Sequence, residues 1–138
     1  MRQSMFVLQA HANRRGLNEI TDSVRNWVAK QEIRSGLLTL FCRHTSASLL
    51  IQENAARAVR NDLEKFFDDI APEGGDYEHD DEGPDDMPAH LKTALTQVQL
   101  NVPVMDGRLM LGTWQGIYLF EHRAHLSTRE IVLHLAGE

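Results

Sequence analysis

The chain has 138 residues, of which 42% are hydrophobic and 25% are charged, and its formal net charge is −6. This length provides one domain with a core of its own, and it excludes a (β/α)₈ barrel, which needs about 250 residues. The acidic balance, without any basic patch, argues against a nucleic-acid-binding protein.

The cysteine content and the N-terminal segment bear on the compartment. Cys42 is the only cysteine, so an internal disulfide is excluded, and its place in an apolar run predicts a core residue rather than a nucleophile. The N-terminal segment lacks the pattern of a signal peptide, and no apolar run is long enough to span a membrane. We therefore expect a cytoplasmic protein with neither a membrane nor a nucleic acid as partner.

Strand and helix patterns alternate along the first half of the chain. We expect a short strand at residues 5–10 and a buried strand at 36–43, where an apolar run follows a glycine. Apolar residues at helical spacing predict helices at 18–31 and 52–70, the second ended by a Pro- and Gly-containing run at 71–75. The residues expected to be buried in these helices are Ile20, Val24, Trp27, Val28, Val59, Leu63, Phe66, Phe67 and Ile70.

A third helix and a series of strands follow. The helix is expected at 86–97, with Asp86 as N-cap, Pro88 in the first turn, and an inner face of Leu91, Leu95 and Val98. An alternating strand at 99–104 leads into an Asp-Gly hairpin turn at 105–108. The further strands are expected at 109–111, 116–122 and 129–136. Together these elements predict an α+β fold, a mostly antiparallel sheet or sandwich packed with about three helices.

The most unusual segment is acidic. Seven carboxylates and no Lys or Arg occur between residues 76 and 86, and His79 and His90 flank the acidic residues. The carboxylates are Asp76, Glu78, Asp80, Asp81, Glu82, Asp85 and Asp86. Such a density of oxygen ligands with imidazoles suits a divalent cation, either Mg or Zn. The alternative is a solvated acidic loop.

Two further segments have a chemical character. His44, Thr45, Ser46 and Ser48 lie between a predicted strand and the second helix, where backbone N–H groups and hydroxyls suit a phosphate or carboxylate. The alternative is that a serine caps a turn. The segment 112–116 is bracketed by glycines, and its Trp114 offers a flat face to a ring, unless it is an ordinary bulge with a packed Trp.

Several segments together resemble the YjbQ-like secondary thiamine-phosphate synthase family. They are H-T-S-A-S-L at 44–49, E-N at 53–54, V-R-N-D at 59–62, Y-E-H-D-D-E-G-P-D-D-M-P-A-H-L-K at 77–92, G-T-W-Q-G-I at 112–117 and E-H-R at 121–123. The resemblance implies a single YjbQ-like domain over residues 1–138 that assembles as a homotrimer. It also implies a reaction that joins hydroxymethylpyrimidine diphosphate to thiazole phosphate with the help of a divalent cation.

The candidate roles follow from this resemblance. The expected metal ligands are His44, His79, His90 and Asp85. The expected catalytic residues are His44, Asn54, Asp85 and Asp86, with Asn54 near the His44 loop. The expected contacts to a small phosphorylated substrate are Thr45, Ser46, Gly112, Thr113, Trp114, Gln115 and Arg123. Two alternatives stay open, namely a metal-binding or ligand-sensing module without catalysis, and a metal-assisted hydrolase of a phosphorylated small molecule.

Overall fold

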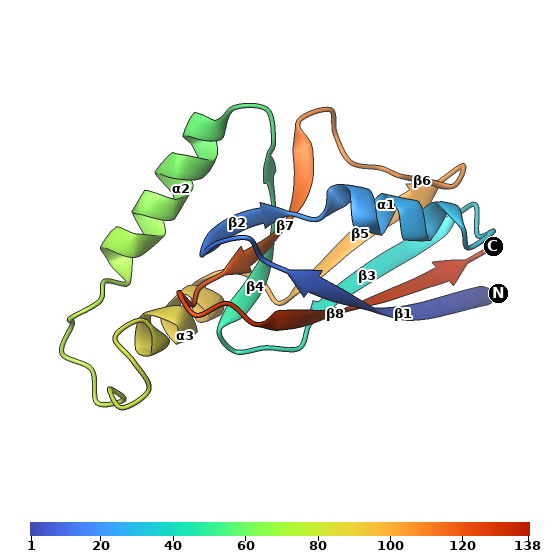
Figure 1. Ribbon diagram of the computed structural model, residues 1–138. Coiled ribbons are helices and arrows are strands. Elements are labelled where there is room, and N and C mark those ends of the chain that lie inside the picture. Colours follow the sequence, from blue (N-terminus) through green and yellow to red (C-terminus); the bar gives the residue numbers. More distant parts are fainter.

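Two antiparallel sheets and three helices make up the structure, a computed structural model that describes residues 1–138 throughout (Figure 1). The larger sheet has the order β1-β8-β3-β5-β6 and the smaller one the order β2-β7-β4. The strands are β1 (Arg2–His11), β2 (Gly16–Glu19), β3 (Gly36–Cys42), β4 (Ala47–Glu53), β5 (Gln99–Met105), β6 (Arg108–Leu109), β7 (Gln115–Glu121) and β8 (Thr128–Gly137). The helices are α1 (Thr21–Ala29), α2 (Arg57–Ile70) and α3 (Asp86–Leu95). The predicted α+β class with largely antiparallel sheets is confirmed.

The core lies between the two sheets and under α1. Leu38 of β3 and Leu133 of β8 meet Leu49 of β4 and Leu119 of β7 there, and Val24 of α1 closes the cluster. Alternate residues of each strand point inward, as in β5, where every second residue is buried. None of the three helices is both long enough and apolar enough to cross a bilayer.

The hairpin turn was predicted correctly. Asp106 and Gly107 both have positive φ angles, 52° and 75°, and Met105 pairs with Arg108 across the turn. Positive φ at both central positions is the geometry that an Asp-Gly pair favours. The strand after the turn is shorter than expected, because pairing with β5 ends at Leu109.

Two strands were missed, and two predicted helices begin later than expected. Residues 18–19 belong to β2, so α1 starts at Thr21. The apolar run at 47–53 is strand β4, which pairs with β7 over seven residues, so α2 starts at Arg57. A short apolar run of this kind fits either a helix or a strand, and pairing with β7 makes it a strand. The His44–Ser48 segment therefore runs between β3 and β4, and not from a strand into a helix.

The helical faces also differ from the expectation. No residue of α2 is fully buried, and Phe66 and Ile70 are 55% and 47% exposed. Figure 1 shows why, because α2 stands away from the sheets and only part of its expected stripe packs on them. In α3 the buried residues are Asp86, Pro88, Ala89 and Lys92, whereas Leu95 of the predicted inner face is 58% exposed. Asp85 is the N-cap residue of α3, without a side-chain capping bond, and Asp86 is already helical.

Candidate metal centre and the adjoining pocket

The two histidines of the acidic segment converge on one carboxylate. Asp86 opens α3, His90 follows one turn later, and the loop before the helix folds back to bring His79 beside them. The Oδ2 atom of Asp86 lies 2.8 Å from Nε2 of His79 and 3.2 Å from Nε2 of His90. The predicted meeting of His79 and His90 is therefore present, with Asp86 between them.

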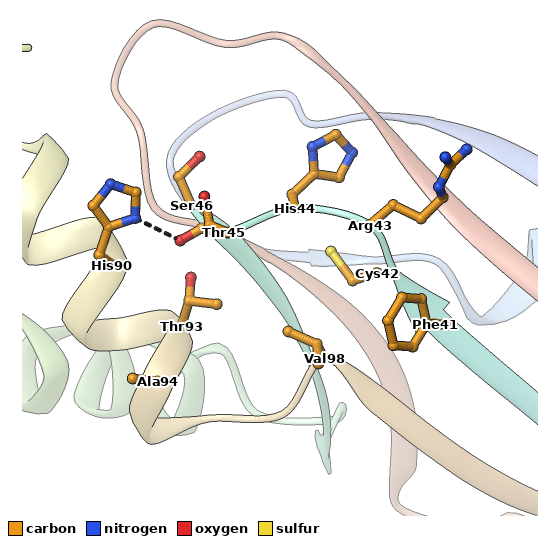
Figure 2. Close-up of a pocket in the computed structure, with 10 residues that line it drawn as sticks. All are labelled: Phe41, Cys42, Arg43, His44, Thr45, Ser46, His90, Thr93, Ala94 and Val98. Carbon is orange, nitrogen blue, oxygen red and sulfur yellow. Dashed lines mark hydrogen bonds between the residues drawn. The ribbon is translucent and has the colours of Figure 1, made fainter.

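His90 has a fixed orientation and a fixed tautomer. Its Nδ1 lies 2.8 Å from the backbone oxygen of Thr45, as Figure 2 shows, and a carbonyl oxygen can only accept a hydrogen bond. The hydrogen of the neutral ring therefore sits on Nδ1, and the lone pair of Nε2 faces the Asp86 carboxylate. Two acceptors at 3.2 Å repel each other unless a second proton or a cation lies between them.

Asp86 is held as an anion in a buried position. It is 4% exposed, and its Oδ1 accepts a hydrogen bond from Nη1 of Arg123. Burial alone raises the pKa of a carboxyl, but the hydrogen bond from His79 and the positive charges around it outweigh burial and lower the pKa of Asp86. The same hydrogen bond, made to Asp86, raises the pKa of His79.

Arg123 clamps the acidic loop to the chain after β7. Its Nη2 donates to the backbone oxygen of Glu82 at 2.8 Å, and its Nε donates to Oδ2 of Asp85 at 3.3 Å. The same Asp85 oxygen accepts the backbone N–H of Ala124 at 2.7 Å. Burial opposes ionisation of Asp85, yet these donors lower its pKa. The carboxylate beside the histidines is therefore Asp86, while Asp85 and Arg123 anchor the loop.

The donor atoms fit a divalent transition metal. One ligand atom each of His79, Asp86 and His90 lie within 4.8 Å of one another, and Oε2 of Glu82 lies 2.9 Å from Nε2 of His79. Two imidazoles with one carboxylate are a donor set of Zn²⁺ and similar ions, whereas Mg²⁺ prefers oxygen ligands throughout. The bond from His90 to Thr45 is the outer contact that usually orients a metal-binding imidazole.

A cavity of about 930 Å³ lies beside this cluster. Figure 2 shows it between α3 and the segment that leaves β3, with His90 on its wall. Its polar part comes mainly from the His44–Ser46 segment, and its apolar part comes from β3, α3 and Val98, which lies between α3 and β5. The residues around it are Phe41, Cys42, Arg43, His44, Thr45, Ser46, His90, Thr93, Ala94 and Val98. The predicted phosphate-binding residues Thr45 and Ser46 thus share a pocket with His90.

His44 is part of the pocket but not of the histidine cluster. Its Nε2 accepts the backbone N–H of Glu130 at 2.8 Å, so this nitrogen is occupied. Burial, followed by the charge of Arg129, lowers the pKa of His44 and keeps the ring neutral near pH 7. The prediction that His44 ligates the metal is not reproduced within the chain.

The residues at 54 and 112–115 form a separate group. The backbone N–H of Asn54 donates to the oxygen of Trp114 at 3.0 Å, and the Asn54 side chain donates to Glu19 at 3.3 Å. Asn54 directly follows β4, whereas His44 precedes it, and a seven-residue strand spans about 20 Å. Trp114 is 63% exposed. Within one chain these residues do not line the pocket, and Asn54 does not lie near His44.

Sequence reasoning missed Arg129. This residue is 5% exposed and lies on β8, where it makes two hydrogen bonds to Glu121, which is fully buried. The signal was present, since Arg129 falls on the same strand face as the buried Ile131 and Leu133. A charge at an inward position of a strand needs a partner and marks a site to inspect.

The structure thus defines a class, an α+β domain of two antiparallel sheets with a histidine–carboxylate cluster beside a pocket. The family model for the UPF0047 protein YjbQ-like family matches residues 6–138, and the chain belongs to this family. The UPF0047 protein YjbQ of Escherichia coli O157:H7 is 46% identical over 133 residues, which cover 96% of both chains. A UPF0047 protein of Synechocystis is 44% identical over 138 residues, covering 99% of this chain and 94% of the relative.

Solved structures agree with the fold. An uncharacterized conserved protein of the YjbQ/UPF0047 family from Clostridium acetobutylicum is 31% identical, with a TM-score of 0.83 over 96% of this chain and 99% of that one. The conserved hypothetical protein TT1486 from Thermus thermophilus is 32% identical, with a TM-score of 0.83 over 95% and 99% of the two chains. These similarities establish the family and the fold, and they do not identify a reaction.

Proposed function

We propose that this protein is an enzyme that uses a divalent metal ion to act on a small phosphorylated substrate. His79, Asp86 and His90 would hold the metal, and the adjoining pocket would hold the substrate. The specific reaction proposed, which follows from the sequence resemblance, is that of a secondary thiamine-phosphate synthase. It joins hydroxymethylpyrimidine diphosphate to thiazole phosphate.

One observation carries the proposal, the position of the His90 ring. Its Nδ1 is bound to Thr45, a pocket residue, and its Nε2 presents a lone pair to Asp86. A cation between these two groups would remove the repulsion and would lie next to the pocket. The side chains of His79 and His90 are 42% and 32% exposed, so the cluster is open to solvent. An open coordination position is typical of catalytic rather than structural sites.

The chemistry assigns a task to each part of the pocket. A bound divalent cation supplies the positive charge that a departing diphosphate requires. The hydroxyls of Thr45 and Ser46 provide hydrogen bonds for phosphate oxygens, and Phe41 with Val98 forms an apolar wall for a heterocyclic ring. In the proposed transfer, the bond from the pyrimidine methylene carbon to the diphosphate oxygen breaks, and this carbon bonds to the thiazole nitrogen.

The first experiment measures the metal. Protein purified without chelator is analysed by mass spectrometry for bound metals, alongside the double variant His79→Ala/His90→Ala. We expect about one divalent ion per wild-type chain and none in the double variant. His134→Ala is the matched control, because His134 is half-buried on β8 and its side chain hydrogen-bonds only to Gln3. Equal metal content in the wild type and the double variant would refute the proposed site.

The second experiment tests the reaction. Metal-loaded protein is incubated with the two phosphorylated precursors, and thiamine phosphate is measured by chromatography. Product formation by the wild type, together with its loss in His79→Ala/His90→Ala, would support the synthase reaction. Release of phosphate without joining would identify a metal-assisted hydrolase instead. Bound metal without turnover of either kind would favour the non-catalytic metal-binding module.

A further inference from the structure

We propose that Arg129, His44 and Ser46 form a binding subsite for a phosphate monoester, independent of the metal. The inference rests on the proposed function in one respect, that the pocket receives a phosphorylated substrate. It adds a buried cation, Arg129, which does not line the cavity itself but lies behind its wall, in contact with the lining residues His44 and Ser46. The subsite would hold the monophosphate of the acceptor substrate while the leaving diphosphate lies near the metal cluster.

A hydrogen bond from the backbone fixes the tautomer of His44. Its Nε2 accepts the N–H of Glu130 at 2.8 Å, and a backbone N–H can only donate. In the neutral ring the hydrogen must therefore lie on Nδ1. His44 is therefore a hydrogen-bond donor at Nδ1, and its Nε2 cannot accept a second hydrogen bond.

A second donor faces the Nδ1–H group of His44. The Nη1 atom of Arg129 lies 3.4 Å from Nδ1 of His44, and a guanidinium nitrogen is also only a donor. These two groups cannot hydrogen-bond to each other. The other contacts of the guanidinium are satisfied, since Nε and Nη2 bind Glu121 and Nη2 also binds Ser46. Nη1 is therefore a nearly buried donor without an acceptor.

An oxyanion resolves this conflict. An oxygen placed between Arg129 and His44 accepts from both, and a buried unpaired N–H is otherwise costly. Ser46 adds a third donor, because its Oγ accepts from Nη2 of Arg129 at 3.0 Å and keeps its own hydrogen. Three donors grouped about the Arg129 guanidinium suit the oxygens of a phosphate group better than the two oxygens of a carboxylate.

The position of this subsite fits the pocket. His44 and Ser46 both line the cavity, and Thr45 between them carries the carbonyl that holds His90. One three-residue segment thus separates the arginine subsite from the histidine–carboxylate cluster. A substrate pair with one phosphate at each place would have its reacting atoms in the cavity between them.

The test uses inorganic phosphate and metal-free protein. Binding is measured by isothermal titration after treatment with chelator, in the wild type, in Ser46→Ala and in His44→Phe. We expect binding to the metal-free wild type and an affinity at least about ten-fold weaker in each variant, because each loses one hydrogen bond to an anion. Acetate, titrated in parallel, should bind more weakly than phosphate. Phosphate binding that disappears on metal removal would overturn the proposal.

Two controls separate the possible outcomes. Arg43→Gln removes an exposed arginine of the same pocket, which pairs only with Glu130 at 3.3 Å, and should leave the affinity within about two-fold. Loss of binding in Arg43→Gln alone would identify the wrong arginine and refute the subsite. His79→Ala/His90→Ala should still bind phosphate, so failure of the metal site and failure of this subsite give different results. Nitrogen NMR of His44 must also report the Nδ1–H tautomer.

Discussion

Glu121 and Arg129 form a doubly hydrogen-bonded ion pair in the interior, with Nε–Oε1 and Nη2–Oε2 distances of 2.7 and 2.5 Å. The pair has neighbours on both sides. Arg129 contacts Ser46 of the pocket, and Glu121 accepts the backbone N–H of Arg123 at 3.1 Å, the residue that binds Asp86. A single buried carboxylate therefore supports both the pocket segment and the loop with the histidine cluster.

The first prediction concerns this pair. Glu121→Gln leaves the Arg129 charge buried without a counter-charge, and breaking a buried pair in this way costs about 3–5 kcal/mol. We expect the free energy of unfolding in urea to fall by this amount. Asp69→Asn is the control, because the Lys65–Asp69 pair is exposed and should contribute at most about 0.5 kcal/mol. Equal effects of the two substitutions would contradict the prediction.

The second prediction concerns His122 and acid. This ring is 1% exposed, and burial followed by the charge of Lys92 lowers the pKa of His122 from 6.5 to about 3. Below pH 6.5 His122 is protonated in the unfolded chain, whereas in the folded chain it stays neutral down to about pH 3. Stability must therefore fall as the pH falls through this window, by about 1.4 kcal/mol per pH unit.

The measurement compares wild type and His122→Gln in urea unfolding between pH 7 and pH 4. Glutamine keeps an amide for the contact with Ser48, which lies 2.9 Å from Nε2 of His122, and it does not titrate. The difference in stability between the two proteins should shrink as the pH is lowered. Parallel curves would show that His122 does not resist protonation in the folded state.

The third prediction separates two neighbouring carboxylates. Asp86→Asn should weaken metal binding by more than about 100-fold, because even residues that only contact a ligand contribute about 10–100-fold. Helix α3 should stay intact, since the Asp86 side chain contacts His79, His90 and Arg123 and not the backbone N–H groups of the helix. Asp85→Asn should lower the affinity for the metal by about ten-fold or less, because Asp85 binds Arg123 and Ala124 instead of the histidines. Competition with a coloured chelator measures the affinity of each variant for the metal. A larger loss of affinity in Asp85→Asn than in Asp86→Asn would assign the metal to Asp85.

Local patterns predicted most of the fold, and the errors have physical causes. The Asp-Gly turn and the alternation in β5 are local signals, and both were predicted correctly. Strand β4 was missed because its state depends on pairing with β7, which lies 68 residues away at the Leu50–Tyr118 pair. The buried stripe expected on α2 was only partly right, since helical spacing gives a face but not the extent of its packing.

The site was predictable in its residue types but not in its partners. His79 and His90 were expected to meet, and they do. Which of two adjacent aspartates joins them depends on the rotation of α3 at its first turn, and the sequence does not define that angle. Arg129 was missed because its partner Glu121 comes from the other sheet. Contacts between sheets need the tertiary arrangement.

The fourth prediction concerns assembly, which the sequence resemblance implies to be a homotrimer. The outer face of the larger sheet carries apolar side chains without a covering element, since Met5 and Leu37 are 67% and 45% exposed. Exposed apolar patches of this kind commonly mark subunit contacts.

Light scattering at micromolar concentration should give about three times the chain mass of 15.7 kDa. Leu37→Asp should shift this mass toward the monomer, whereas Leu95→Asp, an exposed leucine on α3, should not. A wild-type protein that elutes with the mass of one chain would rule out the trimer, and dissociation by Leu95→Asp alone would move the contact to α3.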